Sequence, residues 1–201
     1  WNVETFVQGH EAAFRLGLFL GIFTVMALWE VLAPRRVLTV SKLVRWGNNL
    51  GLVAFNTLLL RLLFPAAAVG MAAFAAEQGW GLLNHFNVPF WLAVPVAVIA
   101  MDLVIWLQHV MVHAVPALWR LHRMHHADLE FDVTTGARFH PIEIILSTVI
   151  KLATIAAVGA PAFAVLIFEV LLNATAMFNH SNIRISTAID RVLRWIVVTP
   201  D

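Results

Sequence analysis

The sequence predicts an all-α protein that crosses a membrane several times, and two observations carry this prediction. Hydrophobic residues make up 61% of the 201 residues, whereas only 12% are charged. Several apolar stretches approach or exceed the roughly 20 residues that a helix needs to cross a hydrocarbon layer of about 30 Å. We therefore expect one membrane-embedded domain over residues 1–201, with about three transmembrane helices and a helical hairpin.

The composition also excludes several kinds of site and partner. Cysteine is absent, which excludes disulfides, thiolate-ligated haem, cysteine-ligated iron–sulfur clusters and thiol zinc sites. The formal net charge is +1 and the chain has no basic run, so a nucleic-acid partner is not expected. Imidazole and carboxylate groups must provide the ligands of any metal site.

The first predicted transmembrane helix covers residues 11–33, and a basic loop at residues 34–45 follows it. By the positive-inside rule this loop is cytoplasmic, which places the start of the chain outside. A second helix is expected at about 47–76, kinked near Pro65 and containing Arg61. Because proline cannot donate a backbone hydrogen bond, it disturbs the helix at that point.

The remaining helices are predicted from apolar stretches and turn signals. Residues 77–88 hold aromatic side chains but no Lys or Arg, which is typical of an outer loop at the membrane interface. A third helix at 89–113 then returns to the cytoplasmic face. Residues 142–158 and 161–178 are separated by a Gly-Ala-Pro turn signal and form the hairpin, which returns residues 179–182 to the cytoplasmic side.

Residues 106–143 contain six of the nine histidines. His109 and His113 are four residues apart, so on a helix both imidazoles lie on one face with Cβ atoms about 5–6 Å apart. Two such rings can bind one ion. Pro116 predicts a break near Val115, which lets the chain fold back toward the first pair.

His122, His125 and His126 repeat the helical spacing. A second short helix would present all three imidazoles on one side. Burying several imidazoles together without a partner is costly, so the five histidines of the two groups predict a metal site on the cytoplasmic side.

The other histidines are assigned by their place in the topology. His180 follows the helix that returns to the cytoplasmic face, so it is a candidate ligand, the alternative being a cap of that helix. His140 precedes Pro141 and is either a ligand or a side chain that orients one. His10 and His85 fall on the outer side and are not expected to bind the metal.

Three further polar residues are candidates for supporting the ligands or lining a substrate channel. Asp102 sits two turns above His109 in an apolar helix, and Asn179 and Asn182 lie on either side of His180. An intramembrane carboxylate marks a functional site or a charge pair. Counting about 1.5 Å per residue places Arg61 at a similar depth to Asp102, so an ion pair that fixes the register of the third helix is the structural alternative.

The ligand type restricts the metal without identifying it. Imidazole suits iron, zinc, copper or nickel. The number of histidines favours two ions, because one tetrahedral zinc needs only four ligands. The HExxH pattern of zinc proteases is absent, and a pair of histidines on one helix cannot supply axial ligands to both faces of a haem.

Four motifs together resemble the histidine boxes of the fatty acid hydroxylase superfamily, which includes sterol desaturases. They are HVMVH (109–113), LHRMHH (121–126), RFHPIE (138–143) and FNHSN (178–182). The resemblance covers about residues 95–201. It implies a non-haem enzyme with two iron ions that uses O₂ as co-substrate to hydroxylate or desaturate a membrane lipid.

The resemblance also implies a missing part and a partner. In the family a further HxxHH box follows a segment similar to VVTP (197–200), so we expect the chain to be truncated before this box. Electrons would come from a separate donor protein of the cytochrome b5, ferredoxin or reductase type. The alternative is a non-catalytic metal-binding or metal-transport protein, which would need polar residues through the membrane, and residues 50–100 contain few.

Overall fold

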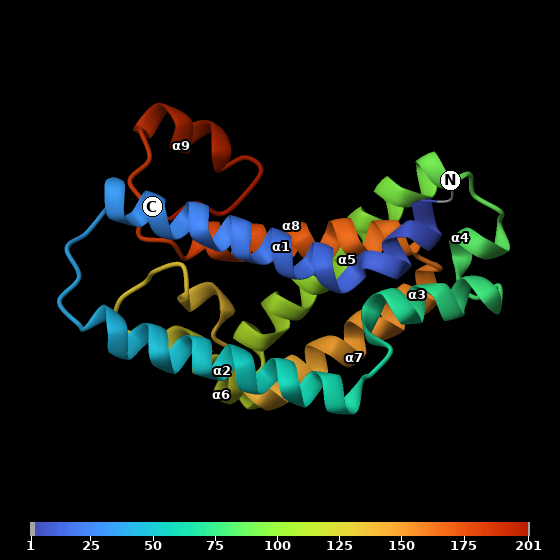
Figure 1. Cartoon of the computed structure of the whole chain (residues 1–201), viewed down its shortest axis with the longest axis horizontal. Helices are drawn as coiled ribbons and strands as arrows, with labels where there is room; N and C mark the ends of the chain where they lie inside the picture. The colour runs from blue at the N-terminus through green and yellow to red at the C-terminus, as the bar shows by residue number, and fades with distance from the viewer. Residues whose placement is uncertain (1–2, 201) are drawn as a thin grey trace.

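The computed structural model describes residues 3–200, and within this range it is helical, with a lone β-bridge between Pro34 and Ile183. The helices are α1 Val3–Leu32, α2 Lys42–Leu63, α3 Ala67–Glu77, α4 Leu82–His85, α5 Phe90–Ala114, α6 Pro116–His122, α7 Pro141–Val158, α8 Ala162–Asn179 and α9 Thr187–Leu193, with 3₁₀ turns η1 His125–Ala127 and η2 Thr135–Ala137. The long helices form an elongated bundle (Figure 1).

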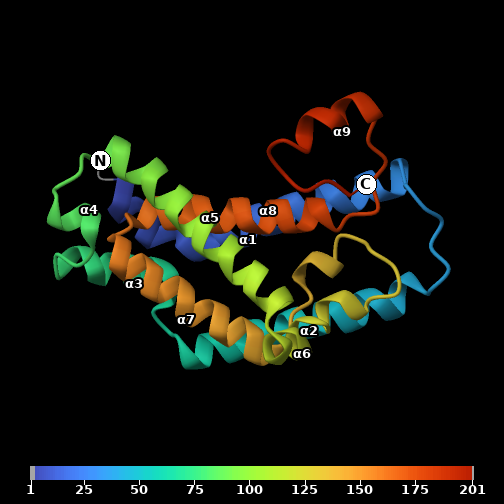
Figure 2. The ribbon, with the colours of Figure 1, turned by 180° about the vertical axis from the view of Figure 1, so that it is seen from behind.

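The bundle has two distinct ends. Helices α1 and α8 lie side by side, and α7 packs against α3 and α5. Both views place α4 at one end of the long axis, whereas α6 and the loop that follows it lie toward the other end (Figure 2). The loops that carry most of the histidine motifs therefore gather toward one end.

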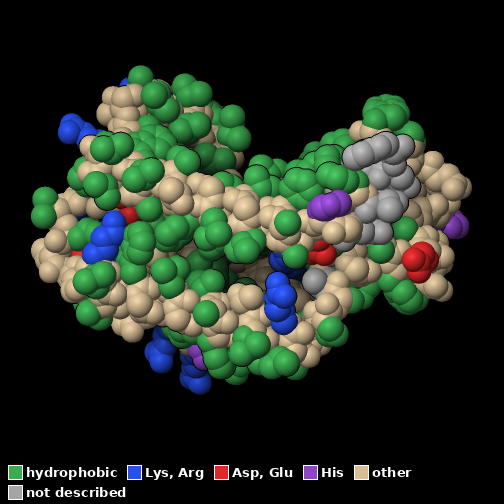
Figure 3. Space-filling model, viewed as in Figure 1, with side chains coloured by type: hydrophobic (Ala, Val, Ile, Leu, Met, Phe, Trp, Pro, Cys, Tyr) green, Lys and Arg blue, Asp and Glu red, His purple; other side chains and the backbone are tan. Residues whose placement is uncertain are grey.

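Five segments within residues 3–200 are long and apolar enough to cross a membrane. They are Gly9–Leu32, Lys42–His85, Phe90–Ala114, Pro141–Val158 and Ala162–Asn179. Hydrophobic side chains are spread over the face shown in Figure 3, and charged ones are few. The helices predicted at 89–113, 142–158 and 161–178 are confirmed to within one residue at each end. The helix predicted at 11–33 is also confirmed, but α1 begins eight residues earlier, at Val3.

The predicted second helix is wrong in one respect: it is broken, not kinked. Helix α2 ends at Leu63, and the N–H of Phe64 donates to the carbonyl of Leu60 as the last bond of the helix. Pro65 cannot donate the next one. The chain makes a turn and resumes as α3, whose buried face consists of small residues such as Ala68 and Ala72.

The core is built mostly from small side chains at the crossings of α3, α5, α7 and α8. Ala93, Ala97, Ala164 and Val165 are each at most 4% exposed. Small residues let helix backbones approach closely, which is how helices associate where surrounding lipid removes the hydrophobic driving force. Between α7 and α8, Gly159 closes α7 in the left-handed conformation with φ 72°, as the predicted turn requires.

The charge pair predicted inside the bundle is wrong. Arg61 and Asp102 are both exposed, and within residues 3–200 no ion pair joins them. Helix α5 packs mainly on α6, α7 and α8 instead of on α2. The buried carboxylate of Glu169 takes the role expected of such a pair: its oxygens lie 2.5 Å from Lys151 Nζ and 3.3 Å from Arg15, which links α8 to α7 and α1.

Candidate metal centre

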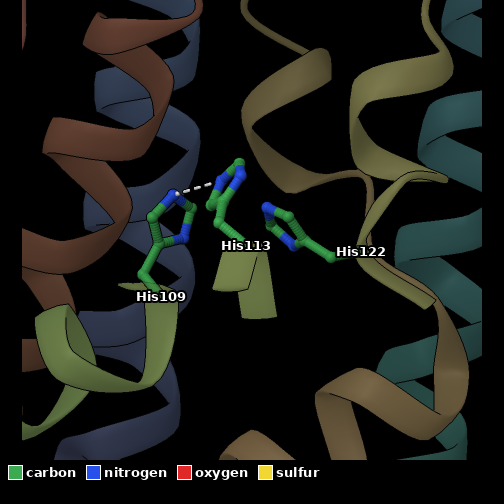
Figure 4. Close-up of side chains that lie close together, drawn as sticks. All are labelled: His109, His113 and His122. Atoms are coloured by element: carbon green, nitrogen blue, oxygen red, sulfur yellow. Dashed lines mark hydrogen bonds between the residues drawn. The ribbon is translucent and has the colours of Figure 1, made fainter. Parts of the chain in front are cut away.

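The end of α5 presents the first two histidines side by side. The Nε2 atoms of His109 and His113 lie 3.2 Å apart. The helix ends at Ala114, Val115 is extended, and Pro116 begins α6, so the predicted break is confirmed. The fold-back brings His122 against the pair: one nitrogen from each of these three histidines lies within 4.8 Å of the others, with the rings facing one another (Figure 4).

The predicted helix through His122, His125 and His126 is only partly formed. Helix α6 ends at His122, and after a turn the 3₁₀ helix η1 begins at His125. The tighter turn still leaves the Nε2 atoms of His122 and His126 3.2 Å apart. It directs His125 toward α8 instead, which one continuous helix would not do.

The residue after α8 completes the cluster. His180 Nε2 lies 2.9 Å from His125 Nε2, although the two are 55 positions apart in the chain. The alternative for His180, a cap of its helix, is also met, because its Nδ1 donates to the carbonyl of Ala176. The structure thus brings together the six histidines 109, 113, 122, 125, 126 and 180, whose neighbouring rings have centroids 4.6–5.3 Å apart.

Three of these rings are oriented through their other nitrogen. His122 Nδ1 donates to the buried carboxylate of Glu143 at 2.6 Å, and His125 Nδ1 donates to the carbonyl of Arg138 at 3.0 Å. His180 is held by Ala176 at 2.7 Å. Metal-binding histidines commonly donate their second ring N–H to a carboxylate or carbonyl, which fixes the tautomer and leaves Nε2 for the metal.

The facing nitrogens of His125 and His180 are the strongest test of whether a metal fits. Carbonyl oxygens only accept, so both Nδ1 atoms carry the hydrogen and both Nε2 atoms present a lone pair. Two lone pairs 2.9 Å apart repel each other unless a cation lies between them. Burial lowers the pKa of His125 to about 3 and also lowers that of His180, so a proton is a poor candidate near neutral pH.

The distances between the facing nitrogens suit a bound metal ion. Two nitrogens bound at about 2.1 Å to one ion and at right angles lie about 3 Å apart. The three Nε2 pairs are separated by 2.9–3.2 Å. The imidazole set therefore fits one or more transition-metal ions.

The loop between η1 and α7 is fixed by buried charges that the sequence pattern does not predict. Arg45 on α2 donates from Nε to Asp128 at 3.0 Å, and its NH1 lies 2.9 Å from Asp132. Hydrogen bonds from Arg45, Thr135 and Asn49 outweigh the effect of burial and lower the pKa of Asp128 to about 2. This loop runs from His126 to Arg138, whose carbonyl holds His125.

Two further contacts place the loop against the end of α8. A Cβ on Gly136 would lie 2.4 Å from the carbonyl oxygen of Ala176, so only glycine permits this approach. Glu30 at the end of α1 accepts the backbone N–H groups of Val133 and Asn182 with one oxygen. Glu30 and Arg45 stand out in the sequence as charged residues within largely apolar stretches. The sequence alone does not show which partner each of them binds.

The other candidates lie apart from the cluster or perform other tasks. His140 accepts the N–H of Ile142 with Nδ1 and caps α7, and no ring contact joins it to the six histidines within residues 3–200. Asn182 bonds the backbone of Arg36 with both ends of its amide. Asn179 has a buried Oδ1 without a hydrogen-bond partner in the described residues, so this oxygen can accept from a ligand.

The remaining histidines are outside this region. His85 is exposed in α4, toward the opposite end of the long axis from α6 (Figure 1). His10 is exposed on α1, where its Nδ1 donates to the carbonyl of Phe6. Asp102 lies exposed on α5.

One comparison with known proteins gives a match. The family model described as fatty acid hydroxylase matches residues 94–201, more than half of the chain. Neither the curated proteins nor the solved structures contain a match to this chain. The matched range includes all six histidines of the cluster and Glu143.

Proposed function

The chain belongs to the fatty acid hydroxylase family, and from this premise we propose that it is an O₂-dependent hydroxylase or desaturase of a membrane lipid. The observation that carries the proposal is the set of three close Nε2 pairs, with the outer nitrogens of three rings already engaged. The metal ligands would be the six histidines 109, 113, 122, 125, 126 and 180. Bound iron would supply the oxidising power that removes hydrogen from an unactivated C–H bond.

Two iron ions fit the cluster better than one. His109, His113 and His122 are in mutual ring contact, with one nitrogen of each within 4.8 Å of the others, and can share one ion. His126 lies against His113 and His122. His125 and His180 form a further close pair, which offers a second site. Six imidazoles exceed the four that one tetrahedral ion accepts.

The residues around the cluster would keep water away from the reacting carbon. The ring of Phe139 stacks on His125 with centroids 4.9 Å apart, and Trp119 lies against both His113 and His126. An apolar wall strengthens electrostatic interactions inside the site and limits side reactions. A lipid tail would reach this wall along the apolar helices that surround it.

We further propose that the centre faces the cytoplasm and receives electrons from a separate donor protein. The positive-inside rule supports this side, because the basic loop at residues 34–45 and helix α6 lie toward the end of the bundle that carries the cluster (Figure 1). Helix α6 contains Arg120 and is followed by Arg123. A donor of the cytochrome b5, ferredoxin or reductase type would then have access to it.

The test is to express the protein in membranes with a donor system and to measure bound metal together with lipid products formed from ¹⁸O₂. The expected result is iron bound to the protein and an oxidised or desaturated lipid. In His113→Ala the lipid product should be lost and the bound iron lowered, whereas His85→Ala should retain both. Metal binding without any lipid product in the presence of reduced donor would contradict the proposal and favour a metal-binding or transport protein.

A further inference from the structure

The segment formed by α9 and the turn after it has two faces of opposite character. Ile189, Val192 and Ile196 recur at spacings of three and four and share one side of the helix, whereas Asp190 and Arg194 lie on another. The turn continues the helical path, because the N–H of residue 197 donates to the carbonyl of residue 193. The segment is therefore amphipathic.

Its orientation is the reverse of that expected for a helix in water. Asp190 is 7% exposed and is bonded by Arg194 and by Thr199, which is also 7% exposed. The apolar side chains face away from the protein: Ile189 is 55% exposed and Ile196 is 80% exposed. Water would favour the opposite arrangement.

The position of α9 indicates what covers its apolar face. Both views show α9 displaced sideways from the bundle, alongside the last turns of α1 and not beyond them (Figures 1 and 2). Hydrophobic side chains dominate its surface in Figure 3. The neighbouring end of α1, which belongs to a segment long and apolar enough to cross a membrane, exposes Leu32 at 82%.

We propose that α9 and the residues through Val198 lie in the headgroup region of the membrane on the side of the metal centre, with the apolar face toward the acyl chains. Trp195 is 88% exposed and belongs to the residue type that concentrates at membrane interfaces. Arg184, just before α9, and Arg191, within it, are also exposed and can meet anionic headgroups. The inference does not depend on the metal or on the reaction.

The absence of cysteine makes a direct test possible. Single cysteines replace Ile189 and Ile196 on the apolar face, or Thr187 and Arg191 on the polar side, and each carries a spin label. The full chain is reconstituted in vesicles of phosphatidylcholine and phosphatidylglycerol. Collision of each label with O₂, which enters lipid, is compared with collision with a water-soluble nickel chelate.

The expected result is a several-fold higher ratio of O₂ to nickel collisions at positions 189 and 196 than at 187 and 191. Replacing phosphatidylglycerol by phosphatidylcholine should reduce the difference, because the arginines lose their anionic partners. Equal ratios at all four positions would place the helix in water and overturn the proposal. Protection of 189 and 196 from both reagents would also overturn it, since that result means that protein covers the face.

Discussion

The histidines of α5 and those that follow it are positioned in different ways. Within the described residues 3–200, the side chains of His109 and His113 hydrogen-bond only to each other. Their other side-chain contacts are with aromatic and imidazole rings. By contrast, the Nδ1 atoms of His122, His125 and His180 are each held by an oxygen. The first pair is exposed, whereas His122 and His125 are at most 1% exposed.

The two groups of histidines are therefore positioned by different features of the protein. The α5 pair needs only a helix, because a spacing of four residues places the rings together. The second group needs the fold, since Glu143, Arg138 and the end of α8 must all be in place. We therefore expect the second group to set the affinity for the metal, and the following variants test that comparison.

The largest effect is expected from removing a ring of the second group. In His125→Ala the facing pair with His180 is lost, so lipid oxidation should fall below detection and bound metal should fall by about half, corresponding to one of the two proposed ions. His140→Ala is the matched control, because this ring caps α7 at a cost of about 1 kcal/mol in stability and should leave the metal in place. The measurements are the bound metal and the lipid product of both variants. Equal losses in the two would return His140 to the ligand set.

A smaller effect is expected from replacing Glu143, the carboxylate that accepts the hydrogen bond of His122. Glu143→Gln keeps the size of the side chain but removes the charge that orients His122. Loss of such a partner weakens metal binding by about 10–100-fold, measurable by competition with a chelator. Glu169→Gln is the control: Glu169 is also buried and ion-paired, but to Lys151 and Arg15. It should lower the unfolding temperature without changing the metal affinity, and a shared loss of affinity would show that Glu143 acts only through stability.

The loop that carries the second group depends on Arg45. Arg45→Met leaves Asp128 and Asp132 as buried carboxylates without their cation, which costs about 3–5 kcal/mol in the free energy of unfolding. Arg61→Met on the same helix removes an exposed arginine and should change it by less than about 0.5 kcal/mol. The free energy of unfolding of both variants is measured in detergent from the loss of helical structure. Similar losses for the two would mean that the charge network does not hold the loop.

The sequence was sufficient for the parts of the centre that depend on local spacing. Apolar length predicted the long helices, Pro116 predicted the fold-back, and the interval of four predicted the pair of His109 and His113. Pairings between distant segments were not predictable. Arg45 finds Asp128 83 positions later, and equal depth alone suggested the wrong partner for Asp102. Depth leaves the rotation of each helix undetermined, and that rotation is set by packing.

The smallest predicted effect is a pH dependence that arises from Asp128. Its pKa is about 2 in the folded protein, against an ordinary value of 3.8 for the same side chain in an unfolded chain. The folded state therefore holds the ionised form more strongly, and the contribution to stability, about 2 kcal/mol, is present above pH about 4 and is lost as the pH falls through about 2. His125, with its pKa lowered to about 3 by burial, also titrates at acidic pH. The measurement is therefore the difference in unfolding free energy between the wild type and Asp128→Asn, in which the contribution of His125 cancels. That difference should shrink as the pH is lowered from about 5 to about 2. A difference that stays constant would mean that the charge of Asp128 is not what Arg45 stabilises, and that the loop is held by the shape of its hydrogen bonds alone.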